Sequence, residues 1–387
     1  MTKRLAYLDI LRVICVGLVM YGHYVLVGGG ATSIPNIIAP GVSLPLIDAS
    51  QWRAYVFEIF LIEHFSTQSA ILGVSLFFLI TGYLMPMMCE RYGRVEFLVN
   101  RFFRIFPTLA ASLALLGLFL YFAQGLIFPA SQYLSSLSLL FFYIPIGSVS
   151  TVLWTLAIEC TFYIIAAMIG RFSLTRLVFV QGCLLAIILA GVKYPENHYL
   201  WIMAWQARFL LMISIGSTIF LAERASGLAE KIQTIFPSIF ISVLGFQIFK
   251  STKVDPSTYE TVGTHLLAVS IFILFWVIGP KLVKRTPGFI KLLSEMVYPL
   301  YLVHAAIGLA TMAVLRSTVS NPYLLLASAV IASIFFAGIL HIIAERPGIA
   351  FGRKAVNRIA GRSYFPWAKA GTLRSVVGTV AAQKDPA

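Results

Sequence analysis

The stretch LDILRVICVGLVMYGH, residues 8–23, decides the fold class. It is the middle of an apolar run from residue 6 to residue 27 that is interrupted only by Asp9, Arg12 and His23. A helix of about 20 mainly apolar residues is long enough to cross a bilayer, so we expect residues 6–27 to span a membrane. Because Asp9 and Arg12 break the run and no small-residue cleavage site follows it, we expect this span to be retained and not removed as a secretory signal.

Similar runs fill the rest of the chain. Of its 387 residues, 59% are hydrophobic and 11% are charged, with a mean hydropathy of +0.89, whereas an ordinary soluble domain has about 25% charged residues. This composition excludes a water-soluble globule and predicts an all-α polytopic membrane protein with about ten transmembrane helices. The predicted spans are 6–27, 70–88, 105–123, 152–170, 177–192, 200–221, 234–249, 262–279, 293–314 and 323–344.

Two segments between the predicted spans are neither spans nor short connecting loops. The apolar piece at 134–146 is too short to cross a bilayer, so we expect it to be interfacial or re-entrant. The long segment 28–69 is read either as a surface loop with an interfacial helix over 52–65 or as a lid or substrate surface. The sequence leaves both interpretations of segment 28–69 open.

The net charge of +14 comes from 29 Lys and Arg residues against 15 Asp and Glu residues. In a soluble protein this balance would indicate a nucleic-acid partner, but in membrane proteins basic residues concentrate in cytoplasmic loops. With ten spans and the N-terminus inside, most Lys and Arg residues fall in the inner segments, which predicts that both termini are cytoplasmic. We therefore expect a multi-pass plasma-membrane protein, in a bacterium an inner-membrane protein, that contacts the lipid bilayer and no nucleic acid.

The chain is expected to form one transmembrane domain over residues 1–350, followed by a basic cytoplasmic tail over 351–387 that is partly disordered. Its cysteines lie within apolar stretches and have no metal-ligand spacing, so we expect neither a bound metal nor a disulfide framework. They are Cys15, Cys89, Cys160 and Cys183.

Ionisable residues inside a bilayer are costly and therefore mark candidate functional positions. Arg12 and His23 lie eleven positions apart, which places them within about 20° of one helical face and about 16 Å apart along the axis. That face would present a cation near the cytoplasmic side and an imidazole near the outer side. The alternative is that Arg12 extends to the inner interface while His23 sits in the outer interface as a satisfied polar residue.

Glu159 and His304 are predicted to lie at a depth similar to that of His23. Helical rise places Glu159 about 10 Å below the outer surface on an inward-running span, and His304 reaches a comparable depth from the opposite direction. Three spans would then place His23, Glu159 and His304 around one polar cavity, if helix packing brings them together.

Arg101 and Arg104 lie three residues apart at the cytoplasmic start of a predicted helix. Both would project from the same side of that helix, which suits a clamp for phosphate oxygens. The alternative is a positively charged anchor that meets lipid phosphates at the inner surface.

Taken in order, five motifs of this chain resemble those of the acyltransferase 3 family of integral membrane O-acyltransferases. They are LDILRVICVGLVMYGH at 8–23, GVSLFFLITGYL at 73–84, RFFRIFP at 101–107, WTLAIECTFY at 154–163 and YPLYLVH at 298–304, with ERP at 345–347 closing the pattern. Each motif alone is moderately specific, whereas their ordered combination covers the whole membrane region. The departures are mild: Thr81 and Thr155 stand where serine is common.

The resemblance implies transfer of an acyl group from cytoplasmic acyl-CoA, expected to be acetyl-CoA, to a hydroxyl of a cell-surface or exported carbohydrate or glycolipid. Arg101 and Arg104 would hold the CoA phosphates, and Arg12 would stabilise the donor or the channel wall. His23 would act as general base on the acceptor hydroxyl, with Glu159 orienting its imidazole.

Three further residues are candidates for substrate binding. Trp154 and Tyr163 would line the acceptor side, where aromatic faces suit sugar rings, or would serve as interfacial anchors. His304 would donate to the developing oxyanion or bind the acceptor, or would be a polar residue of helix packing.

Two other functions use the same kinds of residue. A proton-coupled transporter or permease also places Arg, His and Glu inside the membrane, although we find no inverted repeat with broken helices. A non-catalytic scaffold would bind neither acyl-CoA nor glycan. Within the acyltransferase interpretation, the acceptor stays open among lipopolysaccharide, exopolysaccharide, glycolipid, peptidoglycan and small secondary metabolites.

Overall fold

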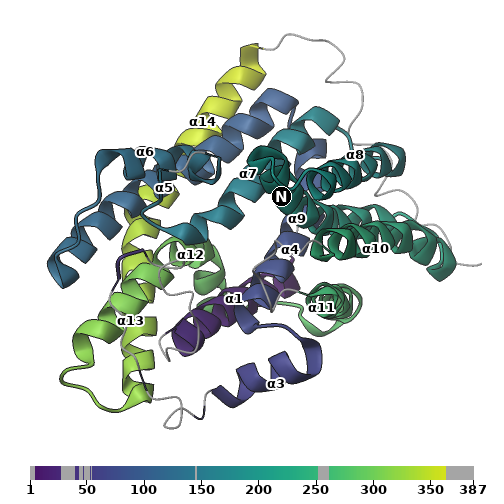
Figure 1. Ribbon diagram of the computed structural model, residues 1–387. Coiled ribbons are helices and arrows are strands. Elements are labelled where there is room, and N and C mark those ends of the chain that lie inside the picture. Colours follow the sequence, from purple (N-terminus) through teal and green to yellow (C-terminus); the bar gives the residue numbers. More distant parts are fainter. Residues whose placement is uncertain are drawn as a thin grey trace, which may run out of the picture.

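The computed structural model describes residues 5–27, 40–42, 47, 53, 55–143, 146–251 and 261–362, and in these residues the chain is helical and has no strand. Ten of the described helices are long and apolar enough to cross a membrane (Figure 1), which confirms the predicted fold class and the predicted spans. They are α1 (Ala6–Gly22), α4 (Ser69–Arg91), α5 (Arg94–Gln124), α7 (Trp154–Ile169), α8 (Leu174–Lys193), α9 (His198–Ala222), α10 (Leu228–Lys250), α11 (Val262–Leu282), α12 (Gly288–Leu315) and α13 (Pro322–Leu340).

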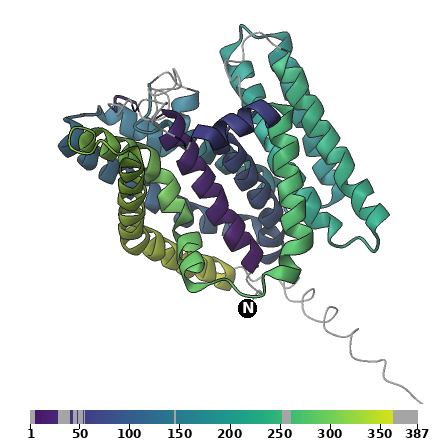
Figure 2. The same cartoon turned by 90° about the horizontal axis from the view of Figure 1, so that it is seen from below.

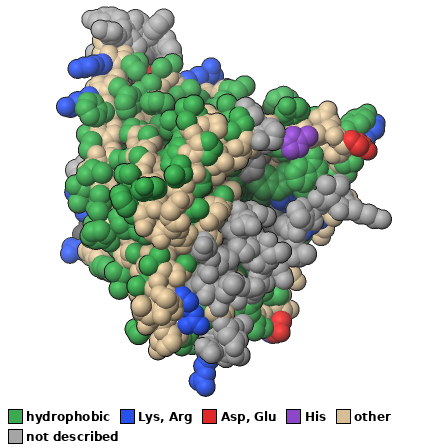
Figure 3. All heavy atoms as spheres, turned by 60° about the vertical axis from the view of Figure 1, so that its left-hand side comes forward, with side chains coloured by type: hydrophobic (Ala, Val, Ile, Leu, Met, Phe, Trp, Pro, Cys, Tyr) green, Lys and Arg blue, Asp and Glu red, His purple; other side chains and the backbone are tan. Residues whose placement is uncertain are grey.

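The surface agrees with a lipid environment. Hydrophobic side chains make up much of the described surface in Figure 3, and the Lys and Arg side chains seen there lie mainly toward its edges. The cytoplasmic location of the termini stays a prediction. We therefore call the side of the bundle where α1 begins the N-terminal side, and the other side the opposite side.

Close backbone contact joins α4 to α9 in the middle of the bundle. A Cβ atom added to Gly82 of α4 would lie 1.7 Å from the carbonyl oxygen of Ile213, and one added to Gly216 of α9 would lie 2.2 Å from the carbonyl oxygen of Leu79. Small residues let helices approach in a bilayer, where packing rather than the hydrophobic effect drives their association. The two glycines thus fix the position of α4, which forms one wall of the site described below.

Segment 28–69 contributes α3 (Tyr55–Phe65), which is the helix expected over 52–65. Figure 2 shows α3 running across the opposite side of the bundle, away from the N-terminus. Its role as a lid or substrate surface stays a prediction, and residues 28–39, 43–46, 48–52 and 54 lie outside the described residues.

The apolar piece predicted at 134–146 does not cross the bundle. It folds as α6 (Ala130–Ser138) and the short 3-10 turn η3 (Leu140–Phe142), so leaving it out of the count of spans was right. Residues 144 and 145 lie outside the described residues.

The last span continues well beyond its predicted end at residue 344. After α13 the chain forms a π-helical turn, η5 (His341–Glu345), and then α14 (Arg346–Arg362). The predicted boundary at residue 350 therefore falls inside a continuous helix, and residues 351–362 of the expected tail are helical. Residues 363–387 lie outside the described residues.

A buried carboxylate ties α3 to the start of α4. Glu58 of α3 is fully buried, and its carboxylate accepts hydrogen bonds from the backbone N–H of Ser69, at 3.1 Å, and from the Ser69 hydroxyl. The N–H groups of the first turn of a helix have no partner within that helix. Glu58 therefore supplies an acceptor to one of them, and α3 is held on the bundle at this point.

We expect Glu58→Gln to change how the thermal stability of the protein depends on pH. Burial raises the pKa of Glu58 above its ordinary value, and the bonds from Ser69 oppose this shift. A carboxyl group whose pKa is higher in the folded than in the unfolded protein stabilises the folded state at pH values below its unfolded pKa. This stabilisation is lost as the pH rises through the folded pKa. Glutamine keeps an acceptor for Ser69 without the buried charge, so the variant should gain stability over the wild type as pH rises.

The measurement is the unfolding temperature of both proteins in the same detergent between pH 4 and pH 8. The control is Glu63→Gln, which changes an exposed carboxylate on the same helix. A difference between Glu58→Gln and wild type that does not change with pH would contradict the prediction.

Candidate active site

A cavity of about 920 Å³ lies among α4, α5, α7, α12 and α14. Small-molecule sites measure about 300–1,000 Å³, so this cavity is large enough for a nucleotide-sized ligand. Its polar and charged lining residues are Arg12, Thr81, Arg91, Tyr92, Asn100, Arg101, Arg104, Thr155, Glu159, Tyr163, Ser294, Glu295, Tyr298, Tyr301, Glu345, Arg353 and Asn357.

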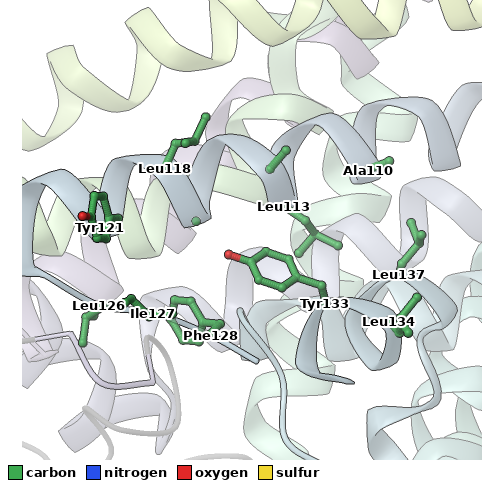
Figure 4. Close-up of a pocket in the computed structure, with 12 residues that line it drawn as sticks. Ala110, Leu113, Leu118, Tyr121, Leu126, Ile127, Phe128, Tyr133, Leu134 and Leu137 are labelled. Carbon is green, nitrogen blue, oxygen red and sulfur yellow. The ribbon is translucent and has the colours of Figure 1, made fainter. Parts of the chain in front are cut away.

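A second cavity, of about 490 Å³, lies between the C-terminal half of α5 and the segment that contains α6. Its lining is apolar apart from Tyr121 and Tyr133, and none of the described residues that form it is charged. Figure 4 shows Tyr133 reaching from α6 toward α5 among leucine side chains. Without a charge this cavity does not suit a phosphate-bearing ligand, so the first cavity is the candidate site.

Arg101 lies deep in the candidate site. Its side chain is 7% exposed and its guanidinium sits over the rings of Phe97 and Tyr163, 5.6 and 5.4 Å from their centroids. Within the described chain its Nε has no hydrogen-bond partner. A buried donor without a partner is costly, and this one lies in the wall of a cavity, as expected for a group that binds a ligand.

Arg104 and Arg12 also line the cavity, as the phosphate-clamp hypothesis requires. Arg104 is exposed and Arg12 is half-buried. Arg12 Nη1 lies 3.5 Å from Asp9 Oδ1, and Asp9 also accepts a hydrogen bond of 2.9 Å from Ser294. The buried Asp9 therefore holds Arg12 in place between α1 and α12.

One face of α7 runs along the length of the cavity. Thr155, Glu159 and Tyr163 follow one another at intervals of four residues, which spaces them by about 6 Å along the helix. Tyr163 donates to the carboxylate of Glu159, and the hydroxyl of Thr81 on α4 donates to it at 3.2 Å. Glu159 thus lies in the middle of the cavity and Tyr163 at its arginine end.

Tyr301 of α12 closes the other end of the cavity. Its hydroxyl hydrogen-bonds with Thr155 Oγ1, at 2.7 Å, and with the carbonyl oxygen of Val152, at 3.2 Å. Its ring lies against Phe77, with 6.2 Å between the ring centroids. The cavity therefore extends about 12 Å along α7, from the level of Tyr163 to the level of Thr155.

The two histidines lie on the far side of Tyr301. His23 Nδ1 and His304 Nε2 are 2.8 Å apart, and the rings are nearly parallel, with an interplanar angle of 4° and centroids 5.0 Å apart. His304 follows Tyr301 by less than one helical turn, and their ring centroids are 5.6 Å apart. The π-helical turn η1 (His23–Val27) begins at His23, and such turns are frequent at functional sites.

The hydrogen bonds of His304 fix the proton positions of the pair. His304 Nδ1 lies 2.8 Å from the carbonyl oxygen of Tyr301, which only accepts, so Nδ1 carries the proton. In the neutral ring, His304 Nε2 is then an acceptor, and His23 Nδ1 donates to it. The lone pair of neutral His23 is consequently on Nε2. His304 is fully buried, whereas His23 is partly exposed.

These contacts correct three of the sequence-based expectations. Of the three residues expected around one cavity, only Glu159 lines it; His23 and His304 do not, although Tyr301 of the lining has its ring centroid 5.6 Å from that of His304. Glu159 contacts Tyr163 and Thr81 and makes no hydrogen bond to His23 in the described chain; the neighbour of His23 is His304.

Tyr163 was expected on the acceptor side with Trp154, but it lies at the arginine end, under Arg101. Trp154 packs against Trp205 and Phe209, with ring centroids 5.2 and 5.0 Å apart, and is not part of the cavity wall.

Several residues of the site were not among the candidates that the sequence indicated. Tyr301 appears in the sequence only as part of YPLYLVH, although its position three residues before His304 is a helical neighbour spacing that could have indicated contact. Asp9 and Ser294 are distant in sequence, and their hydrogen bond depends on tertiary packing. His341 Nδ1 lies 2.6 Å from Glu345, which lines the same cavity.

The described chain is thus an all-helical membrane bundle with a cationic cavity that ends near a histidine pair. The chain belongs to the acyltransferase 3 family: the model of that family, described as an acyltransferase domain, matches residues 5–342. The protein is therefore a membrane acyltransferase. The transporter alternative is set aside on this ground.

The comparison with curated proteins finds no match, and neither does the comparison with solved structures. The family match ends within η5, so α14 and its contribution to the cavity lie beyond the matched residues.

Proposed function

We propose that the protein transfers an acyl group, expected to be acetyl, from acyl-CoA on the N-terminal side to a hydroxyl of a cell-surface or exported carbohydrate. The observation that carries the proposal is the cavity itself, which has arginines at one end and a histidine pair less than one helical turn beyond the other. In this arrangement the N-terminal side is the cytoplasmic side, and the membrane is the plasma membrane, in a bacterium the inner membrane.

The arginine end of the cavity is suited to the phosphates of CoA. Arg101 offers an unpartnered guanidinium Nε in a nearly dry position, and Arg104 adds a second cation one turn away. Hydrogen bonds from guanidinium to phosphate are among the stronger ones in proteins. The pantetheine arm would extend along α7, past Glu159, toward Tyr301.

The distance from this clamp to the histidines matches the length of the donor. The cavity extends about 12 Å along α7, and His304 lies about 4.5 Å beyond Tyr301 along α12. The sum is of the same order as the pantetheine arm. Because Tyr301 stands between the cavity and His304, its side chain must move aside before the thioester can reach His23.

His23 is the general base of the proposed reaction. Its Nε2 takes the proton of the acceptor hydroxyl while the hydroxyl oxygen attacks the thioester carbonyl carbon. The carbon–sulfur bond then breaks, and the proton passes from His23 to the sulfur of CoA, which leaves as the thiol. His304 is a positioning residue here: it accepts from His23 Nδ1 and keeps Nε2 directed at the substrate, the role first expected of Glu159.

Glu159 supports the donor end in this proposal. Its carboxylate binds Tyr163, whose ring lies beneath Arg101. It thereby holds the aromatic surface on which the guanidinium rests. The packing of Trp154 in an aromatic cluster gives no support to a sugar-binding role for this residue.

The test is acyl transfer by the purified protein in nanodiscs, with labelled acetyl-CoA and a panel of glycan acceptors. In parallel, mass spectrometry of surface glycans from cells with and without the gene should show a difference of one acyl group. Absence of acyl-CoA binding together with unchanged glycans would refute the proposal. Transfer of a longer acyl group or to a non-carbohydrate hydroxyl would correct the donor or the acceptor only.

A further inference from the structure

Helix α14 forms part of the wall of the candidate site because it packs very closely against α5. A Cβ atom added to Gly348 would lie 2.7 Å from the carbonyl oxygen of Phe103, and one added to Gly352 would lie 2.8 Å from Phe103 Cβ. The two glycines are four residues apart, so they form one small-residue face that lets two helices touch. Figure 1 shows α14 beside α5.

This contact turns a neighbouring face of α14 toward the cavity. The cavity is lined from this helix by Ile349, Arg353, Val356 and Asn357, at successive spacings of four, three and one residues. Lys354 does not line it, and its ammonium lies over the ring of Phe351 instead. The basic residues of α14 thus divide between the cavity and the outside of the bundle.

Exposed arginines from three helices line the outer part of the cavity, which we call its mouth. Arg91 ends α4, Arg104 comes from α5 and Arg353 from α14, and all three are exposed residues of the cavity lining. Glu295 and Glu345 also line the cavity, and the carboxylate of Glu345 lies 2.6 Å from His341 Nδ1. Because five arginines and three glutamates are among the lining residues, the cavity wall has an excess of positive charge.

The order of these groups by depth matches the order of groups along CoA. Arg101 is nearly buried, whereas Arg104 and Arg353 are exposed. If the pantetheine arm lies innermost, the diphosphate follows at Arg101 and Arg104, and the ribose 3′-phosphate and adenine come last. The outermost position is the one formed with α14, where Asn100 and Asn357 also line the wall. Asparagine amides both donate and accept, as the edge of adenine requires.

We propose that α14 forms the 3′-phosphoadenosine subsite of this enzyme, in which Arg353 binds the ribose 3′-phosphate and Asn357 faces the adenine edge. The proposal rests on the proposed function, since it assumes that the donor is acyl-CoA. It assigns a binding role to a helix beyond the residues that the family model matches.

The test compares the binding of CoA with that of 3′-dephospho-CoA, which lacks only the phosphate in question. Charge-assisted hydrogen bonds contribute about 1.5–3 kcal/mol, so Arg353→Gln should weaken CoA binding by about tenfold or more and leave the affinity for dephospho-CoA unchanged. Arg353→Lys should retain part of the preference for CoA because it keeps the charge. Lys354→Gln is the matched control, since it removes the same charge from the adjacent, outward-facing position and should change neither affinity.

The two proposals fail in different ways. If the wild type binds neither ligand, the proposed function fails. If the wild type binds CoA and dephospho-CoA equally well, or Arg353→Gln weakens both ligands by the same factor, the 3′-phosphate subsite on α14 is wrong although the donor is right. Because Arg353 is exposed, its substitution should leave folding intact, and an unfolding temperature equal to that of wild type would verify this.

Discussion

Replacing His23 with alanine is expected to lower the rate of acyl transfer by about 10²–10⁴-fold, the usual contribution of a general base. The affinity for acyl-CoA should stay close to that of wild type, because His23 does not line the cavity in which we propose that the donor binds. The measurements are the turnover rate and the dissociation constant of acyl-CoA for the same preparation in nanodiscs. Full transfer activity in His23→Ala would remove His23 from the mechanism.

His304 provides the matched comparison. Its side chain accepts from His23 Nδ1 and is itself fixed by the carbonyl oxygen of Tyr301. His304→Leu removes the acceptor and should cost about 10–100-fold in turnover, as loss of a group that orients another does, with little change in KM. His304→Gln restores an acceptor at this position and should recover part of the rate. Equal losses in both variants would indicate that His304 only fills space between α1 and α12.

The positions of the spans follow from the sequence because hydropathy alone determines which segments enter a bilayer. Each of the ten apolar runs is a helix, most of them within a few residues of the predicted bounds, and the short run at 134–146 is not a span. The clearest difference at a helix start is α5, which begins at Arg94, eleven residues before the predicted start at 105. The end of the last helix was missed, since η5 and α14 continue the helix with basic and polar residues that hydropathy places outside the membrane.

The site was predicted less completely, because its geometry depends on which helix faces meet. The RFFRIFP motif predicts that Arg101 and Arg104 share one face of a helix, because they lie three residues apart, and both line the cavity; their binding of CoA stays a prediction. The predicted proximity of His23 and His304 agrees with their contact. Glu159, which we expected to orient His23, contacts Thr81 and Tyr163 instead, because its depth is similar but only helix rotation decides which side chain turns toward α1. Tyr163 was assigned to the wrong end because its aromatic character fits an interface as well as it fits a cation.

Replacing Arg101 with alanine is expected to weaken acyl-CoA binding by about 30-fold or more, since loss of one partner of a buried charge pair costs about 2–5 kcal/mol. Arg101 should have the largest effect of the cavity arginines, because its guanidinium is 7% exposed and is screened from water by Phe97 and Tyr163. Exposed Arg104 should contribute less, and its contribution should fall with added salt. The measurement is the dissociation constant of CoA for each variant at low and high ionic strength.

The choice of substitutions separates a ligand clamp from a lipid anchor. Arg101→Lys keeps the charge but loses the planar fork that binds two phosphate oxygens, so it should recover only part of the affinity. Arg94→Ala removes a charge from the first turn of the same helix, outside the cavity lining, and should leave CoA binding unchanged. An anchor that meets lipid phosphates would give the opposite pattern, with wild-type CoA affinity in Arg101→Ala and in Arg101→Lys. That result would indicate that Arg101 and Arg104 contact lipid phosphates at the membrane surface, and it would contradict the binding of acyl-CoA in the cavity.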